Sequence, residues 1–595
     1  MLRAIVLCLL CVCVLCEDSR VVHTTQGPIR GHRSSVFDGF VFYNVPYATA
    51  PTGRDKFKAS LPPPAWEEPF EAAAGHQIIC PQSDSYNLLP DTVRVEENCL
   101  IANVYVPDHD IESLPVVVHV HGGAFAIGYG DMIDPREMVN SKKVLVVTFN
   151  YRLGIHGFLC LGTEAAPGNA GMKDQVALLR WVQKNIANFG GNPKDVTIVG
   201  GSAGAASVDL LMVSKMARGL FNKVIPESGA NTASFAVHVD PIESAKSYAE
   251  LLNTDIDVND IYALEEFFIK TSLQDLNTIV IAKNDSTVAA GPCVERNIGV
   301  EMFLAESPYD ILKKGDYEKL PMLYGFANME GLMRIFFNRG ELVSDLEYMN
   351  KNFSSYLPAN LQFKNEKERN EVMEKVKTHF FGTVVDEEDI LDYVDYFSDV
   401  FFIQPTLMSV KLQVEAGNDQ IYLYEYSFTD DNNPSSFVPF TKVRGANHCA
   451  QSLAVWGSTL KLPSFNKSEA YENHRKIMQN LWLNFITTGN PTPEGSGLPE
   501  WPAVGRKWSP HMSLGRAVEL RGSLLKERML FWEDIYARHY RYPQPPPTPP
   551  PKLTYCAGHC DFYVIIIAVC YCYVTLYFFR LLVYILFYII VIFYL

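Results

Sequence analysis

Between residues 20 and 540 the sequence lacks internal repeats, low-complexity blocks and linkers rich in Pro or Gly. Nothing in this stretch divides the chain into separate domains, although 595 residues could hold several. Apolar residues make up 48% of the sequence and charged residues 20%, as in globular proteins with a large core. The body of the chain is therefore predicted to be one large domain.

Basic residues and metal-binding patterns are also scarce. The 51 Lys and Arg residues are outnumbered by 67 Asp and Glu residues, which argues against nucleic acids and anionic membrane surfaces as partners. No Cys/His cluster has the spacing of a zinc site. No Gly-Lys-Ser or Gly-Lys-Thr follows the small-residue turn at residues 200–204, which excludes a phosphate-binding loop.

The N-terminus has the features of a secretory signal peptide. Arg3 precedes an apolar run that ends at Cys16, where Glu17 begins a polar stretch, and the run is too short to span a membrane. We expect residues 1–16 to be removed and the protein to be secreted. The expected N-glycosylation sites are Asn284, Asn352 and Asn466.

Five of the thirteen cysteines lie in the body of the chain, so at least one of them is unpaired. Cys160 and Cys293 lie among apolar neighbours and are interpreted as small buried side chains. The other three are Cys80, Cys99 and Cys449.

Apolar runs rich in β-branched residues alternate with segments of helical spacing. A helix is predicted from Met172 to Phe189, capped by Gly190, and another in the Ala-rich segment after Ser202. Continuous apolar strands that alternate with helices indicate the α/β class, with a mostly parallel sheet covered on both faces. The predicted strands are residues 115–120, 144–149, 195–199, 320–326 and 421–428.

The turn Gly200-Gly201-Ser202-Ala203-Gly204 lies between one such strand and the Ala-rich helix, which is the context of the G-x-S-x-G motif. In that motif the serine is a nucleophile on a strained turn. So short a pattern also fits a turn of small residues, and alone it leaves both readings open. A second turn, His121-Gly122-Gly123-Ala124, follows the strand at 115–120 and matches the H-G-G-x loop of α/β-hydrolases.

Further motifs extend the match through nearly the whole body of the chain. They include Val45-Pro46-Tyr47-Ala48, Glu97-Asn98-Cys99-Leu100, Asn150-Tyr151-Arg152-Leu153-Gly154, Phe189-Gly190-Gly191-Asn192-Pro193 and Gly489-Asn490-Pro491. On these residues the sequence resembles the type-B carboxylesterases, the cholinesterase/carboxylesterase family, and is most similar to the insect secreted esterases. The resemblance implies an α/β-hydrolase fold with one catalytic domain, residues 17–542, and a large, mostly parallel central sheet.

The resemblance also implies a Ser-His-Glu catalytic triad. The family's acid lies in an E-G pair after a strand, here Glu330, and its base lies in a G-x-x-H loop, here His448. With Ser202 as nucleophile, the chain order is that of α/β-hydrolases. Ester hydrolysis through an acyl-enzyme would need no metal or cofactor. The resemblance further implies oxyanion-hole N–H groups at Gly123, Ala124 and Ala203, and a disulfide between Cys80 and Cys99.

Three departures from the family pattern are present. Gly201 occupies the position before the nucleophile where the family usually has Glu, so a buried anion near His448 is absent. Residues 449–452 carry no acid, and no cysteines lie near residues 240–255, where the family has its second disulfide. The change at Gly201 is expected to weaken stabilisation of the imidazolium or to alter substrate preference.

Two other functions compete within this resemblance. One is a cholinesterase-like adhesion or partner-binding ectodomain, although such chains often lose a triad residue and this one keeps all three. The other is a cholinesterase, which needs aromatic faces to hold a quaternary ammonium. The loop from Cys80 to Cys99, where that family has its choline-binding Trp, contains no Trp. A neutral small-molecule ester of a lipid, hormone, odorant or xenobiotic is therefore the preferred substrate.

The C-terminal region differs from the body in composition. Residues 543–561 form a Pro-rich spacer. Residues 562–595 form an apolar tail that exceeds the roughly 20 residues needed to cross a membrane, with Arg580 inside it. We expect a membrane anchor; the alternative is a non-native extension. In either case a chain that ends at Tyr542 is expected to be a soluble, active esterase. No oligomeric state is predicted.

Overall fold

The structure is a computed structural model of the 595-residue chain. It describes residues 19–551 and 560–593, apart from residues 74, 76, 85–86, 109–112, 253–254, 278–282, 338–340, 431, 433–442 and 462–466. The expected signal peptide and the expected glycosylation site Asn466 lie outside the described residues. The chain divides into two compact units, Met1–Thr548 and Pro549–Leu595.

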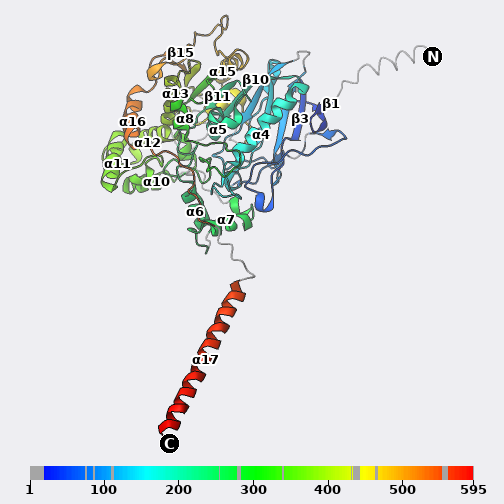
Figure 1. Cartoon of the computed structure of the whole chain (residues 1–595). Helices are drawn as coiled ribbons and strands as arrows, with labels where there is room; N and C mark the ends of the chain where they lie inside the picture. Colours follow the sequence, from blue (N-terminus) through cyan, green and yellow to red (C-terminus); the bar gives the residue numbers. More distant parts are fainter. Residues whose placement is uncertain are drawn as a thin grey trace, which may run out of the picture. The chain divides into compact units, whose positions relative to one another are not determined.

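A 13-stranded sheet forms the centre of the first unit (Figure 1). From β9 to β14 in the order below, every neighbouring pair is parallel. The remaining pairs, at both ends, are antiparallel except for the short parallel pair of β2 with β4. The predicted mostly parallel sheet is thus confirmed. The order is β1 (Ser19–Thr24), β2 (Gly27–Arg33), β3 (Gly39–Pro46), β7 (Ile101–Pro107), β9 (Leu145–Phe149), β8 (Leu114–Val120), β10 (Gly191–Gly201), β11 (Lys223–Glu227), β12 (Met322–Ala327), β13 (Ile421–Tyr426), β14 (His511–Leu514) and β15 (Val518–Arg521), with β4 (Phe70–Glu71) on β2.

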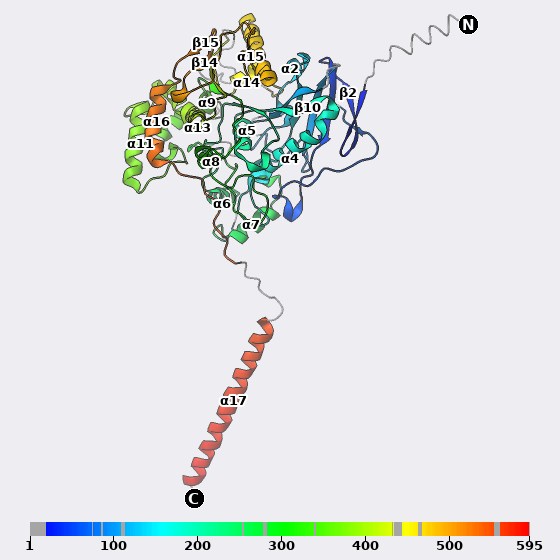
Figure 2. The same cartoon turned by 45° about the horizontal axis from the view of Figure 1, so that its top comes forward.

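Side chains of the central strands alternate between two hydrophobic cores, because successive residues of a strand point to opposite faces. Val116 and Val118 of β8 pack in one core with residues of α4 (Ala170–Asn185) and α5 (Ala203–Val213). Val117 packs in the other core with residues of α14 (Ala450–Trp456) and α15 (Glu469–Thr488). Helices therefore cover both faces of the sheet, as predicted (Figure 2).

The elements around the sheet follow their predicted ranges closely. The helix predicted from Met172 to Phe189 is α4 followed by a 3₁₀ turn over Ile186–Phe189, and Gly190 ends it with φ 90°. The other helices of the first unit are α2 (Arg136–Asn140), α3 (Gly154–Phe158), α6 (Pro241–Leu251), α7 (Ile261–Lys270), α8 (Pro308–Lys314), α9 (Leu332–Phe337), α10 (Leu342–Lys351), α11 (Glu366–Phe381), α12 (Ile390–Ser398), α13 (Gln404–Glu415) and α16 (Lys526–His539). A two-stranded sheet pairs β5 (Gln77–Ile79) with β6 (Val93–Val95).

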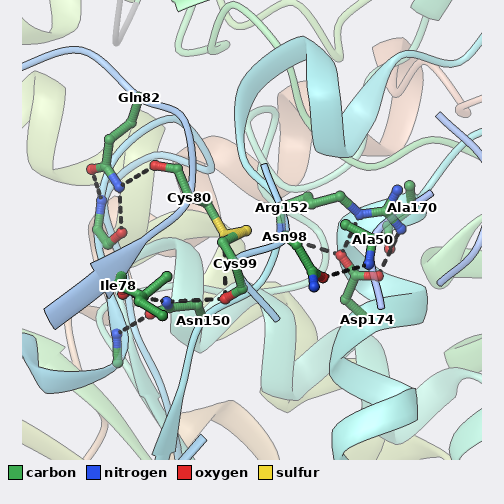
Figure 3. The surroundings of a disulfide bond; sticks show 12 residues. Ala50, Ile78, Cys80, Gln82, Asn98, Cys99, Asn150, Arg152, Ala170 and Asp174 are labelled. Carbon is green, nitrogen blue, oxygen red and sulfur yellow. Dashed lines mark hydrogen bonds and ion pairs between the residues drawn. A yellow bond between two sulfur atoms is a disulfide. The ribbon is translucent and has the colours of Figure 1, made fainter. Parts of the chain in front are cut away.

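The disulfide expected between Cys80 and Cys99 is present (Figure 3). The side-chain amide of Asn150 donates to the carbonyl oxygen of Cys99 at 3.1 Å, which ties the end of β9 to the disulfide loop. Nearby, Nη2 of Arg152 lies 2.7 Å from Oδ1 of Asp174 on α4, and both side chains are fully buried. These contacts tie the end of β9 to the disulfide loop and the segment after β9 to α4.

Cys160 and Cys293 are not separate buried side chains, as the sequence led us to expect, but a second disulfide. Gly168 makes room for it, because a Cβ there would lie 2.8 Å from both sulfur atoms. The side chain of Asn169 binds both the N–H and the carbonyl oxygen of Cys293, at 2.9 and 2.8 Å. The two cysteines are 133 residues apart, so only tertiary structure reveals the pair.

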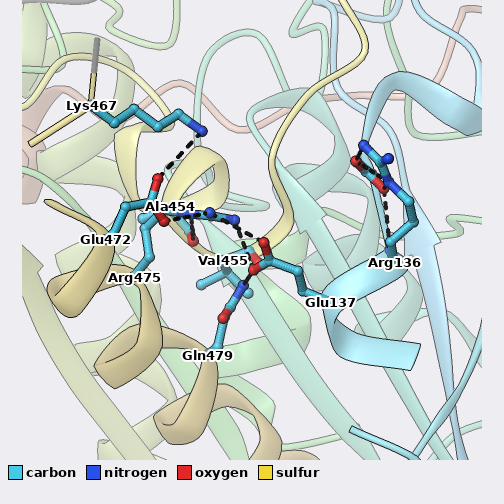
Figure 4. Close-up of polar contacts among 9 residues, drawn as sticks. Arg136, Glu137, Ala454, Val455, Lys467, Glu472, Arg475 and Gln479 are labelled. Carbon is cyan, nitrogen blue, oxygen red and sulfur yellow. Dashed lines mark hydrogen bonds and ion pairs between the residues drawn. The ribbon is translucent and has the colours of Figure 1, made fainter. Parts of the chain in front are cut away.

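Polar contacts join three helices on one face of the sheet (Figure 4). Nη2 of Arg475 on α15 lies 3.0 Å from Oε2 of Glu137 on α2. Nε of Arg475 donates to the carbonyl oxygen of Ala454 on α14 at 3.2 Å. The side chain of Gln479 also donates to Glu137. These bonds fix α14, the helix that begins just after His448.

Two expected glycosylation sites are described. Asn352 is exposed at the end of α10, whereas Asn284 is half-buried and its Oδ1 accepts a hydrogen bond from Arg334. In the second unit, helix α17 runs over Cys560–Phe593. Its segment Val574–Ile592 has exposed side chains and a mean hydropathy of 2.3, and is long and apolar enough to cross a membrane.

Candidate active site

Ser202 lies on a tight turn between β10 and α5, with φ 60° and ψ −124°. This backbone conformation is costly for a residue that has a Cβ, and the surrounding structure must hold it. A Cβ on Gly200 would collide with the backbone of Gly204, and a Cβ on Gly204 would collide with the carbonyl oxygen of Val120. The N–H of Ser202 donates to the carbonyl oxygen of Glu227 at 2.9 Å. On this turn Ser202 lines a cavity.

Glu330 and His448 form a hydrogen-bonded pair next to that cavity. Oε2 of Glu330 lies 2.5 Å from Nδ1 of His448. Glu330 is fully buried just after β12, and its Oε1 accepts from the N–H of Ala327 at 2.8 Å and from the hydroxyl of Ser228. His448 precedes α14 and lines the same cavity as Ser202. The fold thus brings together the three residues that the resemblance selected.

The neighbours of His448 stabilise its protonated form. Its ring stacks on Phe402, with 4.2 Å between ring centres, and its Nε2 lies 3.6 Å from Sγ of Cys449. Burial favours the neutral ring, but the neighbouring Cys449 sulfur and Glu330 carboxylate outweigh it and raise the pKa of His448 above its usual value. The surroundings therefore favour the imidazolium that forms when a histidine accepts a proton.

The loop after β8 lies against the turn at Ser202. A Cβ on Gly122 would lie 3.1 Å from Cβ of Ser202. Gly123 and Ala124 follow with φ of 106° and 55°. Within the described residues, no group accepts a hydrogen bond from the N–H of Gly123, Ala124 or Ala203. Backbone N–H groups that are enclosed by protein normally have an acceptor. Since these three have none among the described residues, they can donate to an oxygen atom of a bound ligand.

The cavity at Ser202 has a volume of about 210 Å³ and a mainly apolar lining. Its lining residues within the described chain include no Asp, Glu, Lys, Arg or Trp. A mainly apolar site that lacks Asp, Glu, Lys and Arg side chains fits a neutral ligand with large hydrocarbon groups. Prominent in the lining are Phe235, Val288, Phe336, Phe337, Phe401 and Phe402.

Glu227, at the end of β11, is a buried acid that the sequence did not single out. Its Oε2 accepts from the hydroxyl of Ser452 at 2.7 Å and its Oε1 from Nε1 of Trp482 at 2.8 Å. Burial raises the pKa of Glu227 to about 7 against these hydrogen bonds. Ser228 was likewise not predicted, because its partner Glu330 lies 102 residues further along the chain.

Comparisons with known proteins identify the family of the chain. The family model described as "Carboxylesterase family" matches residues 18–532. Juvenile hormone esterase of Heliothis virescens is 32% identical over 510 residues, which cover 82% of this chain and 88% of that protein. Carboxylesterase 1C of Mus musculus is 29% identical over 592 residues, which cover 93% of this chain and 99% of that protein.

A solved structure shows the same architecture. The crystal structure of juvenile hormone esterase from Manduca sexta, with OTFP covalently attached, superposes with a TM-score of 0.74 at 29% sequence identity. The superposition covers 87% of this chain and 100% of that one. The chain therefore belongs to the carboxylesterase family and is an α/β-hydrolase that cleaves carboxylic esters as a serine hydrolase.

Proposed function

We propose that Ser202 is the nucleophile of this ester hydrolase, His448 its general base and acid, and Glu330 the residue that orients the imidazole. The observation that carries the proposal is the 2.5 Å contact between Nδ1 of His448 and Glu330, with His448 and Ser202 lining one cavity. Because the carboxylate holds Nδ1, the nitrogen left for proton transfer is Nε2.

In the proposed cycle, Oγ of Ser202 attacks the ester carbonyl carbon while Nε2 of His448 takes the hydroxyl proton. The alcohol leaves with that proton, and an acyl-enzyme remains on Ser202. Water then attacks the acyl group with His448 again as base, which releases the acid. Glu330 stabilises the imidazolium in both halves of the cycle.

The negative oxygen of each tetrahedral intermediate is proposed to bind the N–H groups of Gly123, Ala124 and Ala203. Their lack of acceptors among the described residues supports this role. In comparable sites one such donor contributes roughly 3–4 kcal/mol to transition-state stabilisation. The loop after β8 and the turn at Ser202 would together supply these donors.

Replacement of the nucleophile tests the triad. Ser202→Ala is expected to lower kcat/KM at least about a thousandfold, because the remaining site keeps only the oxyanion donors and the cavity. The variant should be secreted at the wild-type level with an unchanged circular dichroism spectrum. Hydrolysis near the wild-type rate in the folded variant would overturn the assignment.

We further propose that the substrates are neutral esters with a large apolar group. The apolar lining and its lack of Asp, Glu, Lys and Arg among the described residues support this class. Since two relatives named above are juvenile hormone esterases, juvenile hormone is the first natural ester to test. A panel that pairs each neutral ester with a choline ester of the same acid should give the higher kcat/KM for the neutral member. A preference for choline esters would reject this class.

Entry into the secretory pathway is proposed as well. The apolar run before Glu17 and two disulfides in the body support it, because disulfides persist in oxidising compartments. N-terminal sequencing of the mature protein should begin at Glu17. A mature chain that still begins at Met1 would reject the signal peptide.

A further inference from the structure

Glu227 is bonded on two sides, to the turn at Ser202 and to the helix that follows His448. Its carbonyl oxygen accepts the N–H of Ser202 at 2.9 Å. Oε2 of its side chain accepts the hydroxyl of Ser452 on α14 at 2.7 Å. Because α14 begins two residues after His448, one buried residue connects the turn at Ser202 with the segment that carries the histidine.

Both of these segments have backbone conformations that need support. Ser202 has φ 60°, and Cys449, which lies between His448 and α14, has φ 58°. A residue other than Gly keeps a positive φ only where the surrounding structure holds it. The hydrogen bonds of Glu227 hold one segment at the carbonyl oxygen and the other at the carboxylate.

Both carboxylate oxygens of Glu227 act as acceptors. Oε2 binds the hydroxyl of Ser452 on α14, and Oε1 accepts from Nε1 of Trp482 on α15 at 2.8 Å. A carboxamide in the same place would have one oxygen that accepts and one nitrogen that donates, and an indole N–H can only donate. Only the carboxylate therefore accepts from both helices.

Gly201 leaves the space that this contact needs. In the sheet Gly201 of β10 is paired with Glu227 of β11. A Cβ on Gly201 would lie 3.1 Å from Oγ of Ser452, which is closer than ordinary van der Waals contact, so a side chain there would push the hydroxyl from its place. Position 201 is also where the family resemblance leads one to expect Glu. This chain therefore has no acid on the turn itself and a buried acid on the neighbouring strand.

We propose that Glu227 is a positioning residue for ester hydrolysis: through Ser452, its carboxylate holds His448 in the orientation that takes the proton of Ser202. The proposal rests on the proposed function, because Ser202 and His448 are the groups that are positioned. Glu227 is 0% exposed and does not occur among the described residues that line the cavity, so it does not touch the ester. Its loss should therefore lower kcat and leave KM nearly unchanged.

The kinetics and the stability of full-length Glu227→Gln, both measured at pH 8.5, test the proposal. At that pH the wild-type carboxyl is ionised, because its pKa is about 7. We expect kcat for a neutral ester to fall about tenfold through misplacement of the base, with KM within about twofold of the wild type. The thermal unfolding midpoint should be no lower than that of the wild type. A residue that only holds the fold together would lower the midpoint together with the activity.

Ser452→Ala tests the path through α14. It removes the hydroxyl that Glu227 accepts, so it should lower kcat about as much as Glu227→Gln does. The double variant should lose no more than about twofold beyond either single variant, because both changes break the same contact.

Asp209→Asn is the matched control. Asp209 is also fully buried, its Oδ2 accepts from the hydroxyls of Tyr324 and Ser409, and it does not occur among the described residues that line the cavity. Neutralising this acid should leave kcat within about twofold of the wild type, because it has no contact with α14 or with the turn at Ser202 among the described hydrogen bonds.

Three results would overturn the proposal: a wild-type kcat in folded Glu227→Gln, a raised KM with kcat unchanged, or single losses that multiply in the double variant. If Glu227→Gln does not fold, a wild-type kcat in Ser452→Ala has the same consequence. Ser202→Ala separates this proposal from the proposed function. If Ser202→Ala loses hydrolysis while Glu227→Gln keeps it, the triad stands and only the positioning role is rejected. If Ser202→Ala hydrolyses esters at the wild-type rate, the proposed function itself is wrong.

Discussion

Glu227 is a fully buried carboxylate, and no Lys, Arg or His in the described ranges forms an ion pair with it. Its neutral partners are Ser452 and Trp482. A charge in the core without a cation is costly, so its place beside the turn at Ser202 indicates a contribution to the site rather than to stability. Its carbonyl oxygen, which accepts the N–H of Ser202, holds that turn.

Glu227→Gln is predicted to stabilise the folded protein at alkaline pH. Burial raises the folded-state pKa from 4.5 to about 7, so the folded chain binds the proton more tightly than the unfolded chain. Stability is therefore lost as the pH rises from about 4.5 through 7, by about 3 kcal/mol. Unfolding midpoints of variant and wild type at pH 5 and pH 8.5 check this. If the midpoint of Glu227→Gln differs from that of the wild type by the same amount at pH 5 and at pH 8.5, the prediction is wrong.

The two disulfides join cysteines that lie at very different distances along the sequence. Cys80–Cys99 closes a short loop with a sequence separation of 19, whereas Cys160–Cys293 spans 133 residues. The longer bridge restricts the unfolded chain more, so chain entropy assigns it the larger contribution, about 5 kcal/mol against about 3 kcal/mol.

Replacing both members of each pair by alanine tests this ranking. Cys160→Ala with Cys293→Ala is predicted to lower the denaturation midpoint more than Cys80→Ala with Cys99→Ala. Measurements in the same buffer without reductant make each double variant the control for the other. A larger loss from the Cys80–Cys99 pair would show that local contacts, such as the bond from Asn150, dominate over chain entropy.

Elements whose signals are adjacent in the sequence could be predicted. The apolar strand, the glycine spacing and the Ala-rich helix around Ser202 occupy one short stretch, and β10 and α5 occur there. Glu330 and His448 were located only through the family resemblance, since an acid or a histidine carries no local signal of its role. Ser228 and the Cys160–Cys293 pair could not be found, because their partners lie 102 and 133 residues away.

For the molecule as a whole, the first compact unit extends to Thr548, a little beyond Tyr542. The Tyr542 ring packs on Tyr309, with 5.5 Å between ring centres. Further on, Cβ of Pro546 lies 3.0 Å from the position that a Cβ on Gly162 would take. The start of the Pro-rich segment therefore packs on the hydrolase body, and we propose Thr548 as the better end for a soluble chain.

A chain that ends at Thr548 is predicted to be secreted, soluble and as active as the full chain within about twofold. One that ends at Tyr542 should also be active but unfold at a lower temperature, because it loses about 1 kcal/mol of packing from the Pro546 region. The full chain, which contains Val574–Ile592, should sediment with membranes, and both shorter chains should not. Activity lost in the Thr548 chain would mean that the tail belongs to the catalytic unit.

The assignment of Ser202 as the nucleophile is tested most directly by an organophosphate ester, which transfers a phosphoryl group to an activated serine. Peptide mapping of the labelled full-length protein should locate one phosphoryl group on Ser202, in step with the loss of ester hydrolysis. Labelling should slow at least about a hundredfold in His448→Gln, because the base that activates the hydroxyl is absent. A phosphoryl group on another residue, or full inhibition with Ser202 unmodified, would contradict the account.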